Sequence, residues 1–139
     1  MDNILLLHSS IRWLILIAGL LAMLTHIGTI SNITTYSKYN RISALIFAIT
    51  MDLQTAIGAI LLTRNIIALG YDYLITVIPH AASMILAIIT AHIASRWSKS
   101  SQKIMSTLIA TIISLLFMLA GIREITRNYR KLVWINIPI

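Results

Sequence analysis

Apolar residues along the chain gather in four long blocks separated by short polar stretches. The blocks cover residues 4–30, 42–63, 73–95 and 104–122. Each block reaches about the 20 mostly apolar residues that a helix needs to cross a bilayer. A helix satisfies its backbone hydrogen bonds internally, as a segment surrounded by lipid must. The pattern therefore predicts four membrane-spanning helices and almost no soluble domain.

The connections between the blocks are short, which favours antiparallel neighbours in one bundle. They cover residues 31–41, 64–72 and 96–103, and a basic tail occupies residues 123–139. No Pro- or Gly-rich linker and no internal repeat divides the chain. We therefore expect an all-α, integral membrane four-helix bundle, with residues 1–139 forming a single transmembrane domain.

Composition agrees with a membrane protein and narrows the chemistry. The chain is 58% hydrophobic and only 11% charged, whereas soluble domains carry about 25% charged residues. The net charge of +7 indicates basic side chains beside the spans that meet anionic lipid headgroups, not a nucleic-acid surface. The chain has no cysteine, which excludes disulfides, covalent c-type haem and cysteine-bound iron–sulfur clusters.

The number of basic residues does not predict which end of the bundle faces the cytoplasm. The connections and tail at the two ends carry equal numbers of Lys and Arg. The acidic residues Asp2, Asp72 and Glu124 all fall on the side of the termini. We expect the termini outside and the loops 31–41 and 96–103 in the cytoplasm. A bacterial inner membrane is the expected location, with an organelle inner membrane as the alternative.

All four histidines lie in the first and third blocks. These two helices run in the same direction, so His8 and His80 should lie near one membrane face and His26 and His92 near the other. Imidazole is a standard axial ligand of haem iron, and facing helices of a bundle often hold ligands. The pairing by depth predicts that these histidines hold b-type haem, with one haem expected in preference to two.

The helical spacing limits this prediction. His8 and His26 are 18 residues apart and share one helix face, whereas the 12 residues between His80 and His92 leave them about 120° apart. Pro79 can re-aim His80 by kinking the helix. The alternative is that each histidine hydrogen-bonds a neighbouring helix and binds no cofactor. Zinc is less favoured, since no carboxylate or cysteine joins the histidines.

Three further polar residues lie inside the spans. Arg12 follows His8 by one turn, and we expect it to pair with Asp52, although it could also meet a haem propionate. Asp52 and Gln54 could instead belong to a proton path or a quinone site, because ionisable groups within the membrane are often functional.

These residues form a recognisable pattern. The first span carries His8-Ser9-Ser10-Ile11-Arg12-Trp13, the second carries Asp52-Leu53-Gln54 followed by Gly58, and the third carries His80, Met84, Ala87 and His92. Together they resemble small four-helix bacterial membrane proteins labelled "cytochrome b", of the Bacteroidetes type. The resemblance implies b-type haem and a respiratory setting, and it extends to His8, Arg12, His80 and His92. His26 has no counterpart in it.

Two function classes follow. The first is a membrane haem protein, or haem-carrying subunit, that passes electrons within a respiratory complex. The second is a non-catalytic accessory subunit without a cofactor. Little chain lies outside the membrane to bind a soluble substrate, so we expect an electron-transfer or accessory subunit in preference to an enzyme by itself. Expected partners are other membrane subunits, lipid headgroups, a quinone or a second copy, and not nucleic acid.

Overall fold

A computed structural model describes residues 3–36 and 38–134, with side chains described as far as residue 128. Its α-helices are α1 (Asn3–Ile30), α2 (Lys38–Leu69), α3 (Tyr71–Trp97) and α4 (Ile104–Trp134), and a short 3-10 helix, η1 (Ser101–Lys103), precedes α4. Four helices are long and apolar enough to cross a membrane, and the described residues form no strand. The predicted all-α four-helix fold and its membrane class are confirmed.

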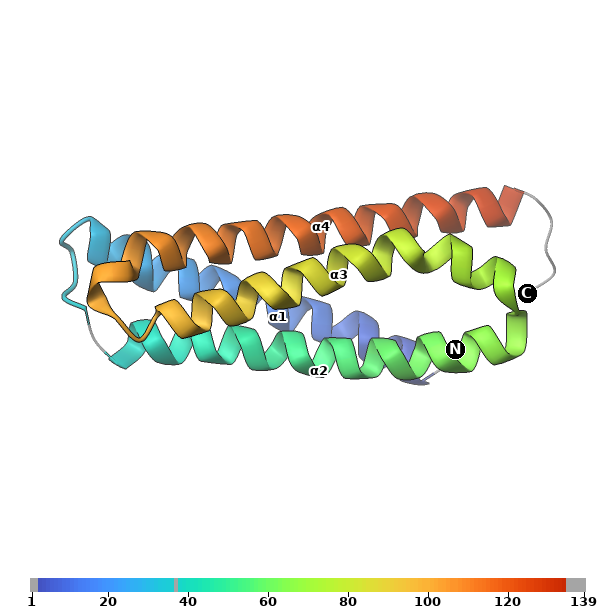
Figure 1. Ribbon diagram of the computed structural model, residues 1–139, viewed down its shortest axis with the longest axis horizontal. Helices are drawn as coiled ribbons and strands as arrows, with labels where there is room; N and C mark the ends of the chain where they lie inside the picture. The colour runs from blue at the N-terminus through green and yellow to red at the C-terminus, as the bar shows by residue number, and fades with distance from the viewer. Residues whose placement is uncertain (1–2, 37, 135–139) are drawn as a thin grey trace.

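The helices form an antiparallel bundle in which each packs on two neighbours (Figure 1). The most extensive contact joins α3 to α4, followed by α1 with α2, α2 with α3, and α1 with α4. Helices α1 and α3 therefore lie diagonally across the bundle. Both histidine-bearing helices can direct side chains into the same interior.

The interior combines small and polar side chains with some large apolar ones, while most large aliphatic side chains lie on the outside. Large buried residues such as Phe47 and Met118 are interleaved with fully buried alanines of α2 and α3. On the outer surface, Leu24 and Ile60 are more than half exposed. Small residues let helix backbones approach closely, and lipid solvates the exposed aliphatic groups.

Helix ends depart from the expected connections. Only Gly70 separates α2 from α3, in place of the expected loop of residues 64–72. Helix α4 continues beyond residue 122 to Trp134, so the first part of the predicted tail is helical, and residues 135–139 lie outside the described chain. Apolar blocks mark the part of a helix that lipid surrounds, whereas a helix continues into the headgroup region until a residue such as Gly70 stops it.

The first connection is fixed by a Schellman motif. Asn32 has a φ of 56°, its N–H donates to Thr29 O, and the N–H of Ile33 donates to Gly28 O. These two bonds satisfy carbonyls that the end of α1 leaves unpaired. Farther along, the Tyr36 hydroxyl donates to Ser98 O at 2.6 Å, which ties this connection to the end of α3.

Candidate functional site

A cavity of about 270 Å³, partly open at the surface of the bundle, is lined by residues of all four helices. We call it the histidine cavity. Its walls are mainly aliphatic, from Leu5 of α1 to Ile125 of α4. Its polar lining residues are His8, Gln54, Thr55, Arg64, Asn65, Tyr73 and His80. The structure thus brings His8 and His80 together, one from each of the two diagonal helices.

His80 is held by a hydrogen bond that also sets its tautomer. Its Nδ1 lies 2.8 Å from Gly121 O of α4, and because a carbonyl can only accept, Nδ1 carries the proton and donates. Nε2 is then left with a lone pair and no hydrogen-bond partner among the described residues. Metal-binding histidines commonly donate one ring N–H to a carbonyl in this way.

His8 is held less completely. The Gln54 amide nitrogen of α2 donates to Nε2 of His8 at 3.2 Å. Nδ1 of His8 and Oε1 of Gln54 are buried and have no hydrogen-bond partner in the described part of the chain. A buried polar atom without a partner costs about 1–3 kcal/mol. Such atoms beside a cavity indicate a missing partner, such as a ligand.

Both rings rest against a glycine of the neighbouring helix. A Cβ at Gly58 would lie 3.1 Å from Cε1 of His8, and a Cβ at Gly121 would lie 3.3 Å from Nδ1 of His80. Any larger side chain would crowd the rings. The two histidines therefore occupy equivalent settings, on α1 over α2 and on α3 over α4.

Polar side chains line the cavity near the turn between α2 and α3. The Asn65 amide donates to the Tyr73 hydroxyl at 3.0 Å, and Arg64 donates to the Asn65 carbonyl oxygen at 3.3 Å. The first bond joins the two helices on either side of Gly70, and the second lies within α2. The group offers a cation and hydrogen-bonding groups at one end of an otherwise apolar space.

His26 lies apart from this site, fully buried between helices. Its Nδ1 donates to Ala22 O of its own helix at 2.6 Å, and its Nε2 has no partner among the described residues. His92 points elsewhere: its side chain is 55% exposed on the outer face of α3. The structure does not bring His26 and His92 together, so the second depth pair is not formed.

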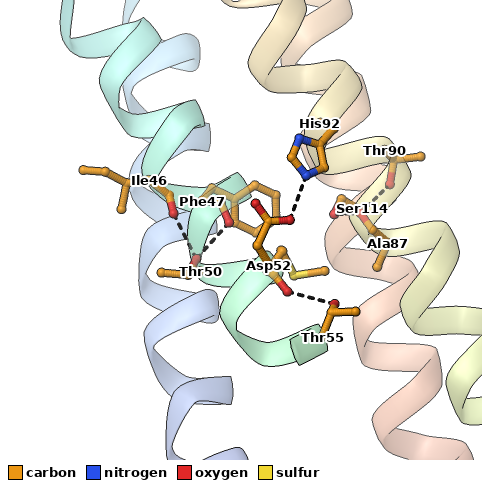
Figure 2. Close-up of polar contacts among 10 residues, drawn as sticks. Ile46, Phe47, Thr50, Asp52, Thr55, Ala87, Thr90, His92 and Ser114 are labelled. Carbon is orange, nitrogen blue, oxygen red and sulfur yellow. Dashed lines mark hydrogen bonds and ion pairs between the residues drawn. The ribbon is translucent and has the colours of Figure 1, made fainter. Parts of the chain in front are cut away.

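His92 instead contacts α2. Figure 2 shows its ring beside the Asp52 carboxylate, with Nε2 2.8 Å from Oδ1. The expected pair between Arg12 and Asp52 is wrong, because Asp52 faces α3 on the outside of the bundle. Gln54, two residues on, is about 200° away around the helix and is therefore buried against His8. Within the described chain Arg12 forms no ion pair.

Sequence reasoning missed several residues of the site. Gly58 enters the predicted pattern only as a motif position, and the predicted histidine site includes neither Gly121 nor Tyr73. Arg64 and Asn65 were placed in a connection that is in fact helical. The helical period could have separated Gln54 from Asp52. Two residues apart on a helix, their side chains point to different faces, so they could not belong to one site.

Among the described residues, no group of three or more His, Asp or Glu side chains could hold a metal ion through protein ligands alone. No protein-family model, curated protein or solved structure matches the chain. The fold and site define an integral membrane four-helix protein with an internal histidine-lined cavity, and its resemblance to the small "cytochrome b" proteins stays a prediction.

Proposed function

We propose that the chain is a membrane electron-transfer protein that holds one b-type haem between His8 and His80. The observation that carries the proposal is the pair of histidines from diagonal helices on one apolar cavity. Bis-histidine ligation needs two imidazoles on opposite sides of a flat ring, and α1 and α3 supply them from opposite corners of the bundle.

The donor set fits such a group. Among the described residues Nε2 of His80 has no hydrogen-bond partner, and its Nδ1–H donates to Gly121 O. His8 offers Nε2, which now accepts from Gln54, or its buried Nδ1, which has no partner in the same part of the chain. Arg64 and Tyr73 line the same cavity and suit the carboxylates that haem carries. The volume of about 270 Å³ lies just below the range of small-molecule sites, roughly 300–1,000 Å³.

The protein's own contribution is ligation and exclusion of water. Haem would supply one-electron chemistry at its iron. The aliphatic lining lowers the local polarity, and this lining together with the imidazoles of His8 and His80 would tune the reduction potential of a bound haem. With little chain outside the membrane, the protein would pass electrons to membrane partners of a respiratory complex, with a quinone as a candidate donor, in a bacterial inner membrane.

The accessory-subunit class is the second candidate. One observation favours it: all four histidines already bond within the chain, His8 to Gln54, His80 to Gly121, His26 to Ala22 and His92 to Asp52. In that class the histidines join helices and the cavity holds lipid. The two classes differ in colour, because only a haem protein absorbs visible light.

The test is a reduced-minus-oxidised absorbance spectrum of the chain purified alone from cells supplied with haem precursor. We expect a b-type spectrum, and a pyridine haemochrome assay should count one haem per chain. A flat spectrum from helical, monodisperse protein would reject the haem proposal and leave the accessory subunit.

A further inference from the structure

The Asp52–His92 pair is a polar group on the lipid-facing surface of the bundle. The two side chains are 47% and 55% exposed, and they lie outside the histidine cavity. Asp52 is ten and eleven residues from the ends of its apolar block, or about 15 Å from each at 1.5 Å per residue. His92 lies nearer the end of α3, but helical side chains lean toward the N-terminus, here deeper into the span.

In a monomer this position would leave the exposed side of the Asp52–His92 pair in contact with lipid acyl chains. Ionisable groups within the hydrocarbon layer are costly and normally face protein or water. Acyl chains supply no donor or acceptor, and headgroups do not reach the middle of the layer, whose total thickness is about 30 Å. The exposed half of the pair would therefore be stabilised by a polar partner on another membrane-spanning segment.

The hydrogen-bonding capacity of the pair is self-complementary. Nε2 of His92 and Oδ1 of Asp52 bond each other, and no bond of Nδ1 or Oδ2 occurs within the described chain. The least costly state in lipid is net neutral. In that state, whichever partner holds the shared proton, Nδ1–H remains a donor and Oδ2 remains an acceptor.

We propose that the chain forms a two-fold homodimer through the outer faces of α2 and α3. A two-fold axis beside the pair lets Nδ1–H of each His92 donate to Oδ2 of the other copy's Asp52, which closes a ring of four side chains. A two-fold interface places the same residues opposite each other at the same depth. A different protein would have to bring its own matching donor and acceptor to that depth.

The surface around the pair suits helix packing. Ala56 follows Asp52 by one turn and is small and exposed, which allows close approach of two α2 helices. On α3, Ile89 precedes His92 by one turn and is 50% exposed. Both can be buried against the second copy. The proposal does not depend on what the histidine cavity binds.

The natural absence of cysteine makes disulfide trapping a clean test. We expect Ala56→Cys and Ile89→Cys to form disulfide-linked dimers in lipid vesicles at high lipid-to-protein ratio. Leu116→Cys is the matched control, because Leu116 is 59% exposed on α4 and faces lipid in the dimer. Counting photobleaching steps of the labelled, cysteine-free chain should give two steps per particle.

The pair itself is tested by Asp52→Leu/His92→Leu, which removes both polar groups together. We expect association to weaken by about tenfold, the effect of losing hydrogen bonds worth roughly 1.4 kcal/mol, with unchanged helical content. Single photobleaching steps in the native chain, equal trapping at Leu116→Cys, or unchanged dimerisation of the double variant would each overturn the proposal. Trapping in cells to a different protein only would also overturn it.

Discussion

Single polar atoms define the site more sharply than whole side chains do. His80 and His26 make the same kind of bond, Nδ1–H to a backbone carbonyl. They differ in the position of the other ring nitrogen, Nε2. The His80 ring lines the cavity, whereas the His26 ring is fully buried among packed helices. A ligand can reach only the first.

Gly121→Leu tests the close approach between α3 and α4. The new side chain would collide with His80 and Ser83, which already lie 3.3 Å from an ideal Cβ. Overpacking of this kind costs about 1–3 kcal/mol and should displace the His80 ring. We expect a lower unfolding temperature in detergent, measured by tryptophan fluorescence. Under the proposed haem ligation, we also expect the b-type absorbance signal to be lost.

Ala120→Leu is the control for this variant, since it adds the same side chain at the next residue of α4, on the exposed surface. It should change stability by no more than about 0.5 kcal/mol. Equal unfolding temperatures for the two variants would contradict the role given to Gly121.

The sequence predicted polar residues in the spans but not their directions. Asp52 and Gln54 were treated as one possible site, whereas the structure separates them onto the lipid side and the cavity side. Helical period alone could have shown this. It could not have shown which face is inside, because α2 is apolar on nearly every side and so gives no amphipathic signal.

Contacts between helices depend on a few buried polar bonds. The Ser114 hydroxyl of α4 donates to Ala87 O of α3 at 2.6 Å (Figure 2), at the most extensive contact in the bundle. Lipid cannot drive apolar helices together, so packing and such bonds hold them.

Ser114→Ala should therefore lower the free energy of unfolding by about 0.6–1.7 kcal/mol, measured by denaturant titration in mixed micelles. Ser106→Ala on the same helix is the control, because within the described chain Ser106 makes no hydrogen bond to α3. An effect no larger than the control's would show that the α3–α4 contact rests on packing alone.

The turn between α2 and α3 depends on one residue. Gly70 has φ 78° and ψ −164°, a region that is almost exclusive to glycine. An added Cβ would meet nothing within 4 Å, so Gly70→Ala isolates the backbone effect. We expect a loss of about 1–3 kcal/mol in thermal unfolding, against little change for the neighbouring Leu69→Ala. Equal stability of both variants would contradict the strained turn.

Element positions were the most predictable feature of the chain, and element ends the least. Each apolar block lies inside a helix, because length and hydropathy suffice to identify a span. The ends of α2 and α4 could not be read from hydropathy. Arg64 and Asn65, for example, are polar but helical, and the bond from Asn65 to Tyr73 that holds the turn connects residues from two elements.

In the whole bundle most large aliphatic side chains lie outward and most polar groups of the spans lie inward, with the Asp52–His92 pair as an exception. Depth along the weaving helices predicted that His8 and His80 would be neighbours in the membrane, and both line one cavity. The same argument failed for His26 and His92, because depth carries no information on rotation about the helix axis.

The orientation of the bundle in the membrane is a prediction about the whole molecule. With the termini outside, Tyr71→Cys should react with a membrane-impermeant maleimide in intact spheroplasts, because Tyr71 is 71% exposed at the outer turn. Ser101→Cys, in η1, should react only after permeabilisation. The reverse pattern would place the termini in the cytoplasm, against the expectation from the acidic residues.

The pairing of His8 with His80 is tested most directly by four single variants in which each histidine is replaced by leucine. Reduced-minus-oxidised spectra, normalised to folded protein, should lose the b-type signal in His8→Leu and His80→Leu. They should keep it in His26→Leu and His92→Leu, which serve as internal controls. Retention of the signal in either of the first two variants, or its loss in His92→Leu alone, would contradict a haem held across the histidine cavity.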